Sequence, residues 1–321
     1  MASTSQGAAL TEAHRQQQQQ VRAAFLVEFL ALWALLDSTR LDDTGPGWVR
    51  AVLPLVRRYR AESARVAAVY YDEFRQAEAV AAVSPRVVLP RRGGAPELSR
   101  PARAATPAAA TPAAPSLAPD PAGGSGRPTG GARVRFDDSA FNLPDPRRAR
   151  IDVPEIDWAR EDRAVVVSLT VTGPVGQKSK AGRGKLLQVA RDESFVAASG
   201  AASRHVLTGG RRSLLTLVEN DTRAIGWIRV TDGDPCSWCA LLAGRGPVYR
   251  TEQSAGFSAH DACACQAEPV YSRDTLWPGR AAEFRRLYRE VTTGTTGRDS
   301  INAFRRAYEQ RRRDGQRTNV A

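Results

Sequence analysis

Four cysteines and one histidine, gathered within thirty residues, constrain this chain more than any other feature of its sequence. They form two groups, Cys236-Ser-Trp-Cys239 and His260-Asp-Ala-Cys263-Ala-Cys265, and the chain contains no other cysteine. Two thiolates separated by two residues can face one metal across a tight turn, and a second pair can complete a closed tetrahedral site. The pattern therefore predicts a structural zinc ion, because thiolates are soft ligands that Mg²⁺ and Ca²⁺ do not favour.

Five candidate ligands compete for the four positions of such a site. The spacing favours Cys263 beside His260, because His-x2-Cys closes a compact turn, and Cys265 stays an alternative. Two disulfides are a second interpretation, but crowded cysteines in a chain without a secretory signal favour metal binding. A redox Cys-x2-Cys pair would need a thioredoxin-like sheet beside it, and the sequence indicates none.

No catalytic arrangement is recognisable around the cluster. A catalytic zinc needs an open coordination position and a general base, whereas every candidate ligand here can close the site. The other two histidines, His14 and His205, belong to no acid–base or metal motif. Neither G-x-S-x-G nor a G-x-x-x-x-G-K-[ST] phosphate loop occurs. We therefore expect a protein that is not an enzyme.

The charge balance favours an anionic partner. The net charge is +12 and the pI is near 10.3, which points to nucleic acid first and to a membrane surface second. About half of this charge lies in residues 273–321, which hold twelve arginines and six acidic residues. Lysine occurs at only three positions, so a general preference for arginine is the alternative explanation. The most apolar run, residues 21–36, contains Arg22 and Glu28 and is shorter than the ~20 residues that cross a bilayer.

Apolar periodicity predicts an α+β fold that is mainly helical. Helices are expected over residues 11–36, 48–82, 186–207, 213–223, 281–291 and 301–313, the first two packed as an antiparallel hairpin. Strands are expected at Val165–Val171, a β-branched run, and at Ile225–Val230. Gly209 is expected to cap the helix before it, and Ser213 to begin the next one.

A segment rich in Pro, Ala and Gly separates two folded parts. Such a segment buries too little apolar area to offset its ordering entropy, so we expect a disordered linker over residues 85–133. The predicted organisation is a helical region (1–84), this linker, a domain with the zinc knuckle (134–272) and an Arg-rich helical tail (273–321). The zinc domain is expected to be treble-clef-like, with an apolar shell of Trp238, Leu241, Leu242, Val248, Tyr249 and Phe257.

The stretches Arg229–Tyr249 and Ala259–Tyr271 resemble the MuF-like minor head proteins of actinobacterial tailed phages and prophages. That family shows a Cys-x2-Cys pair followed by a His-x2-Cys-x-[Cys/His] element, and Cys236, Cys239, His260, Cys263 and Cys265 fall on those positions. Weaker similarity extends over residues 10–85 and 160–272. Ala264 stands where a basic residue is common in the family, and the linker is longer and richer in Pro and Ala than the family leads one to expect.

The resemblance implies a minor virion protein that acts in head morphogenesis at the portal and the capsid interior. The chain would be made in the bacterial cytoplasm and would end in the phage head. On this hypothesis the helical N-terminal region binds the portal or major capsid protein, and the Arg-rich tail faces packaged DNA, without any membrane contact. The alternatives are a free-standing zinc-dependent nucleic-acid-binding protein and a metal-dependent nuclease or peptidase.

Overall fold

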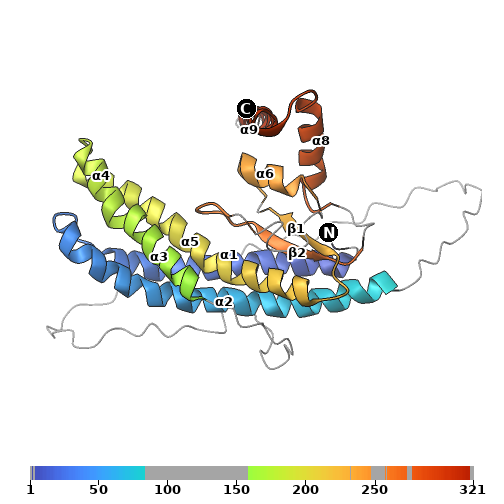
Figure 1. The fold of residues 1–321 in the computed structure, drawn as a ribbon, viewed down its shortest axis with the longest axis horizontal. Helices are drawn as coiled ribbons and strands as arrows, with labels where there is room; N and C mark the ends of the chain where they lie inside the picture. The colour runs from blue at the N-terminus through green and yellow to red at the C-terminus, as the bar shows by residue number, and fades with distance from the viewer. Residues whose placement is uncertain are drawn as a thin grey trace, which may run out of the picture. The chain divides into compact units, whose positions relative to one another are not determined.

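The computed structural model describes residues 2, 4–83, 158–231, 233–246, 257, 259–272 and 277–318. This part of the chain is mainly helical and includes one two-stranded sheet, which confirms the mainly helical fold (Figure 1). The predicted linker, 85–133, and two expected members of the apolar shell, Val248 and Tyr249, lie outside the described residues. The helices that are described are each too short or too polar to cross a membrane.

Two long helices open the chain, as the periodicity predicts. Helix α1 (Ser5–Trp33) begins after Thr4, whose side-chain oxygen accepts a hydrogen bond from the backbone N–H of Gly7 at 2.9 Å. A short connection leads into α2 (Leu41–Val83), which packs along α1. The second helix starts seven residues earlier than its predicted start at Trp48, and Pro54 lies inside it without ending it.

The predicted strand at Val165–Val171 is wrong. These residues form the end of α3 (Ala159–Thr170) and the start of a π-helical turn, η3 (Val171–Val175), which continues into α4 (Gly176–Gly182). Val165 and Leu169 are fully buried one helical turn apart, in the same core as α1 and α2. Packing of this helical stripe therefore outweighs the β preference of the valines.

The predicted helix cap at Gly209 is also wrong. Helix α5 runs without interruption from Leu187 to Asn220, and Ser213, the expected start of a new helix, is buried inside it. Gly209 and Gly210 lie where α5 crosses α2. A Cβ on Gly209 would clash with the carbonyl oxygen of Arg60, and one on Gly210 would lie 2.9 Å from the carbonyl oxygen of Ser63. The glycines therefore allow two helices to approach closely.

Helices α1, α2, α3 and α5 share one continuous apolar core. Aromatic rings from α1, α2 and α5 fill it, with the centroids of Trp33 and Trp48 5.2 Å apart and those of Phe29 and Phe195 6.1 Å apart. A second cluster, around Tyr70, Phe74, Leu214 and Trp227, joins α2 and α5 to the sheet.

The sheet and three further helices form the rest of the described chain. Strand β1 (Gly226–Val230) confirms the strand predicted at Ile225–Val230, and it pairs in antiparallel fashion with β2 (Gln266–Val270). Helix α6 (Ser237–Ala243) packs against α8 (Ala281–Val291) and α9 (Gly297–Thr318) through a third apolar cluster that includes Leu241, Phe284 and Tyr308. The predicted helix 281–291 matches α8, and α9 extends beyond the predicted 301–313 at both ends.

Because α2 and α5 cross so closely, we expect a methyl group added at the crossing to destabilise the fold. Gly209→Ala should lower the free energy of unfolding by about 1–3 kcal/mol or more, because the new Cβ meets backbone that cannot rotate away. Denaturant unfolding followed by circular dichroism measures this change. The matched control is Gly182→Ala, at the end of α4, where a Cβ meets nothing within 4 Å and the change should be neutral or slightly stabilising. Equal stability of the two variants would contradict the close crossing.

Candidate metal centre

The sheet brings the two ligand segments together. Val230, the last residue of β1, pairs with Gln266, the first residue of β2. The knuckle follows β1 and the histidine segment precedes β2, so both leave the sheet at the same end. Pairing of two strands that lie 36 positions apart in the sequence therefore assembles the cluster.

The first segment forms a knuckle at the start of α6. Cys236 is the N-cap residue of this helix, and its Sγ accepts a hydrogen bond from the backbone N–H of Cys239 at 3.4 Å. The helical turn then aims both sulfurs at the same point. The hydrogen bonds that Cys239 offers from its side chain and backbone lower the pKa of the Cys236 thiol and raise that of the Cys239 thiol, so the first proton of this pair leaves readily, as metal binding requires.

The second segment turns tightly after His260. The backbone N–H of Cys263 donates to the carbonyl oxygen of His260 at 3.1 Å, and Ala262 adopts a left-handed conformation with φ of 61°. The N–H of Ala262 donates to the carbonyl oxygen of Gly200 in α5 at 3.0 Å, which fixes the turn to the helical bundle. His260 and Cys263 thus reach the knuckle from a turn held by α5.

All five candidate ligands predicted from the sequence meet in this centre. The Nε2 atom of His260 lies 3.0 Å from the Sγ of Cys236 and 3.3 Å from the Sγ of Cys239, whose own Sγ is 3.6 Å from that of Cys263. A tetrahedral metal with bonds of about 2.3 Å to sulfur would place two sulfurs about 3.8 Å apart. Cys239 belongs to two groups whose ligand atoms all lie within 4.8 Å, one with Cys236 and His260 and one with Cys263 and Cys265. The cluster could therefore hold a metal ion.

His260 presents the correct nitrogen to this cluster. Its Nδ1 lies 2.7 Å from the carbonyl oxygen of Asp261, which can only accept a hydrogen bond, so Nδ1 carries the proton. The Nε2 lone pair is then directed at Cys236 and Cys239. Such a carbonyl contact to the remote ring nitrogen is the usual way in which proteins orient a metal-binding histidine.

Two buried arginines, which no sequence motif indicated, lie beside the cluster. Arg211 of α5 donates to the carbonyl oxygens of Cys263 at 2.6 Å and Cys265 at 3.0 Å, and Nη1 of Arg229 lies 3.9 Å from the Sγ of Cys239. Their exposed fractions are 2% and 1%. A buried cation is costly unless an opposite charge compensates it, and three thiolates around a divalent ion leave a net negative centre.

Both guanidinium groups also lie against one aromatic ring. The Cζ atoms of Arg229 and Arg211 lie 3.9 and 5.0 Å from the ring centroid of Phe257, which also stacks on Trp227 at 5.4 Å. Burial lowers the pKa of Arg211 to about 10, and the neighbouring thiols oppose that shift. The one sequence signal for these arginines is the position of Arg229 inside an otherwise apolar strand.

The other polar residues near the cluster are engaged in structural contacts. Asp261 forms an ion pair with Arg204 at 2.7 Å, and Glu268 accepts a hydrogen bond from the Thr11 hydroxyl at 2.6 Å. His205 lies 3.0 Å from Ser168 Oγ, and His14 stacks on the ring of Tyr70. Of the predicted apolar shell, Phe257 packs against the cysteines, Leu241 packs against α8 and α9, and Trp238 is exposed.

Comparison with known proteins links this chain to bacteriophages. The sequence model of the VG15 protein family matches residues 5–113 and 158–291, a range that includes all five candidate ligands. The chain is 27% identical over 155 residues to the Gene 15 protein of Mycobacterium phage D29, an alignment that covers 33% of this chain and 56% of that protein. The chain thus spans about half the length of this relative. No solved structure matches. Together the two matches support a phage-associated protein.

Replacement of single cysteines tests which sulfur is the fourth ligand. We expect Cys263→Ser to lose the bound metal and Cys265→Ser to retain it, because Cys263 shares the closed turn with His260 whereas Cys265 continues directly into β2. Metal stoichiometry by native mass spectrometry of reduced protein measures both. Cys239→Ser, which removes the sulfur common to both groups, serves as the metal-free reference. Loss of metal from Cys265→Ser alone would reverse the assignment.

Proposed function

This chain belongs to the VG15 protein family, and we propose that it is a minor structural protein of a bacteriophage head, of the MuF-like kind, stabilised by zinc. The observation that carries the proposal is the Cys/His centre within a chain that resembles a phage protein. On this proposal the protein acts in head morphogenesis and becomes part of the virion. It works by binding its neighbours and not by catalysis, because the acidic groups beside the centre are already paired.

Zinc suits this centre better than other common metals. Three thiolates and one imidazole are a common ligand set of four-coordinate structural zinc sites, and the sulfur separation is close to tetrahedral spacing. The segments joined here contribute only two five-residue strands and a seven-residue helix. Coordination stabilises such small units by about 10 kcal/mol or more in peptides, so the ion would hold the knuckle onto the histidine turn.

Helix α1 and the two residues that follow it offer a surface for a neighbouring head protein. Every exposed residue between Ala13 and Leu35 is uncharged, and the exposed fractions of Val27, Leu30 and Leu35 are 73%, 57% and 55%. Alternating steps of three and four residues lead along this face through Ala13, Gln16, Gln20, Ala23, Val27, Leu30 and Ala34. This is the spacing by which one helix packs against another. We propose that this face binds a helix of the portal or the major capsid protein.

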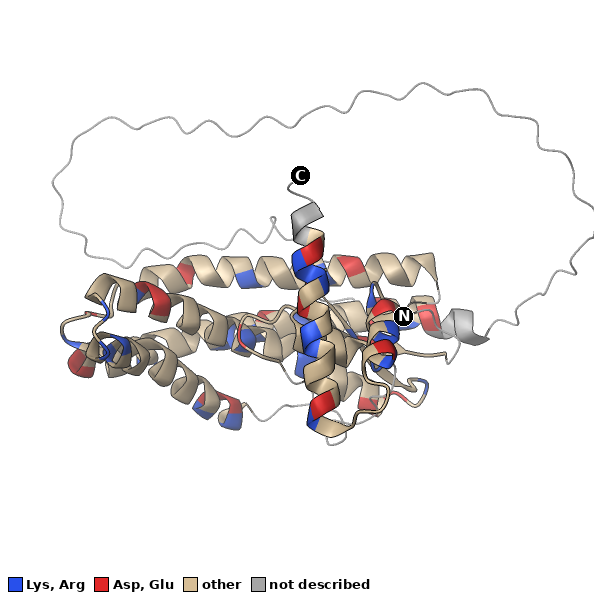
Figure 2. Ribbon diagram, turned by 90° about the horizontal axis from the view of Figure 1, so that it is seen from above, with Lys and Arg blue, Asp and Glu red and all other residues tan. Residues whose placement is uncertain are grey.

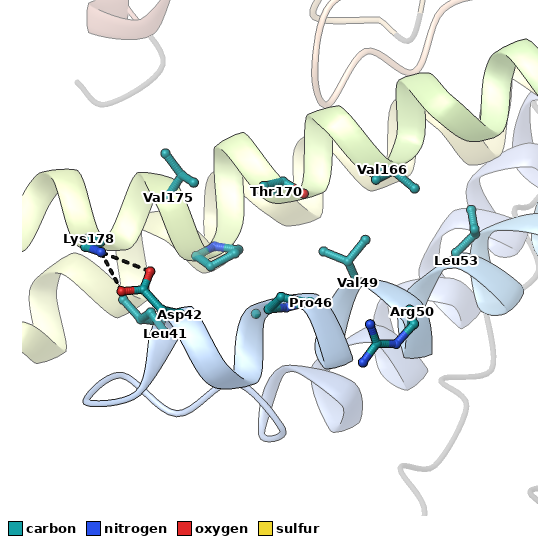
Figure 3. Close-up of a pocket in the computed structure, with 12 residues that line it drawn as sticks. Leu41, Asp42, Pro46, Val49, Arg50, Leu53, Val166, Thr170, Val175 and Lys178 are labelled. Carbon is teal, nitrogen blue, oxygen red and sulfur yellow. Dashed lines mark hydrogen bonds and ion pairs between the residues drawn. The ribbon is translucent and has the colours of Figure 1, made fainter.

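A groove between α2 and the α3–α4 segment lies in the same helical bundle. Its volume is about 410 Å³, and Val49, Leu53, Val166 and Val175 line it (Figure 3). An ion pair of 2.6 Å between Lys178 and Asp42 spans it. Two of these valines, Val166 and Val175, are partly open to solvent, with exposed fractions of 37% and 51%. The groove supports the proposed docking role of the bundle.

The C-terminal helices suit the interior of a filled head. Charged residues of both signs run along α9 toward the C-terminus, with arginine in excess (Figure 2). Phe284 and Leu287 of α8 and Phe304 and Tyr308 of α9 are buried against one another and against α6. We therefore propose contact with packaged DNA by a folded surface, on which arginines meet phosphates without reading the bases.

Removal of the ion tests the zinc proposal. Purified, reduced protein should contain one zinc per chain, and treatment with a strong chelator should unfold the segment around β1, α6 and β2, because coordination joins its parts. Hydrogen exchange measured by mass spectrometry reports this loss segment by segment, and added zinc should reverse it. Protein that contains no zinc, or exchange unchanged by the chelator, would contradict the proposal.

A charge placed on the α1 face tests docking. The double variant Val27→Asp/Leu30→Asp should fold normally, since both side chains are exposed, but should be absent from phage heads assembled in its presence. Mass spectrometry of purified particles measures incorporation. Ala8→Asp/Ala61→Asp adds the same charge at exposed positions outside this face, one on α1 and one on α2, and should be incorporated like the unchanged protein. Equal incorporation of both variants would exclude the face.

A further inference from the structure

Three arginines line a small cleft where α6, α8 and α9 meet. The cleft has a volume of about 280 Å³ and is lined by Leu241, Gly244, Arg245, Arg285, Tyr288, Arg289 and Ile301. No carboxylate is among these lining residues. Leu241 and Ile301 supply apolar walls, and the exposed fraction of the Tyr288 side chain is 36%. The cleft therefore combines three positive charges with an accessible aromatic ring.

Packing at the end of α6 brings the arginines together. A Cβ on Gly244 would lie 3.1 Å from the backbone nitrogen of Arg285 and 3.2 Å from the carbonyl carbon of Phe284. The end of α6 thus touches the backbone of α8, so that Arg245 projects beside the arginines of that helix. The Arg285 guanidinium stacks over the ring of Trp277, with Cζ 4.7 Å from the centroid. This stacking holds the Arg285 guanidinium in place before any anion binds.

The carboxylates of α8 are used elsewhere. Glu283 pairs with Arg280 at 2.8 Å, and Glu290 pairs with Arg311 of α9 at 3.0 Å. Within the part of the chain that the structure describes, the three cleft arginines form no ion pair. Three neighbouring cations repel one another, and an anion bound between them relieves this repulsion. The arrangement thus has the charge of a binding site for an anion.

We propose that this cleft binds backbone phosphates of DNA. The planar guanidinium fork matches the oxygens of a phosphate, and arginines from two elements can contact successive phosphates of one strand. The exposed Tyr288 ring offers a surface on which a sugar or base can pack. The contacts that these arginines offer are to phosphates, which carry no sequence information, so we expect binding to be independent of sequence.

This inference rests on the proposed position of the chain inside a phage head, where packaged DNA is the dominant anion. It assigns the contact to a specific group of arginines and includes Arg245, which precedes the Arg-rich tail. Arg311 and Arg312 near the C-terminus are instead paired with Glu290 and Asp234. The number of arginines in the tail is therefore a poor guide to where the anion binds.

The triple variant Arg245→Gln/Arg285→Gln/Arg289→Gln tests the cleft in the full-length, zinc-loaded protein. Binding to a mixed-sequence DNA duplex is measured by fluorescence anisotropy at several salt concentrations. The dependence of log K on log salt should weaken by about 0.9 for each phosphate that the variant no longer binds, so up to about 2.7 for three. The control Arg311→Gln/Arg312→Gln/Arg313→Gln removes the same charge from α9 and should change the slope little. Thermal unfolding of both variants shows that each is folded.

Three results would overturn the proposal. The first is an equal effect of the two variants, which would indicate net charge alone, and the second is no effect of the cleft variant. The third is poly-glutamate binding that matches DNA binding in affinity and in dependence on the cleft, which would indicate an acidic protein partner. Incorporation of the unchanged protein into heads is a separate measurement. Its absence would refute the proposed function while the DNA result stands, and normal incorporation without DNA binding would refute only the cleft.

Discussion

Helices α2 and α5 cross at two consecutive glycines, and this close approach determines where the other elements lie. The residue after the pair, Arg211, extends from the crossing to the carbonyl oxygens of Cys263 and Cys265. Nine residues before Gly209, the carbonyl oxygen of Gly200 holds the histidine turn. One stretch of α5 therefore fixes the helical bundle on one side and the second ligand segment on the other. The metal centre is therefore held in place by the helical bundle and does not stand apart from it.

Local patterns in the sequence predicted the elements whose determinants are local. The long amphipathic helices, the strand at Ile225–Val230 and the five metal-ligand candidates were all identifiable, because each depends on residues close together in the chain. The strand predicted at Val165–Val171 failed because valine prefers strands, and only the buried positions Val165 and Leu169 reveal the helix. The prediction that Gly209 ends a helix failed for the same kind of reason. A glycine that ends a helix and one that admits a neighbouring backbone look alike until that backbone is in view.

The buried arginines show a further limit of sequence reasoning. Arg211 is followed by Arg212, a pair that resembles a solvated helix surface, and Arg229 lies between Ile228 and Val230 in a short strand. Both acquire their roles from a partner ten or more positions away or from a centre formed by other segments. The same applies to the C-terminal helices, whose composition suggests a basic tail although Phe284, Phe304 and Tyr308 are buried in the third apolar cluster. Net charge located the basic region, and only packing separates paired arginines from those that line the cleft.

The absence of side chains at Gly209 and Gly210 also limits how this protein can vary. A larger residue at either position is compatible with the fold only if α2 and α5 move apart at Arg60 or Ser63, and a shift of α5 would move Arg211 relative to the cysteine segment. Substitutions on the two helices must therefore compensate one another. Among relatives that keep the cysteines, we expect the residues at positions 209 and 210 and those that face them in α2, at positions 60 and 63, to change together or not at all.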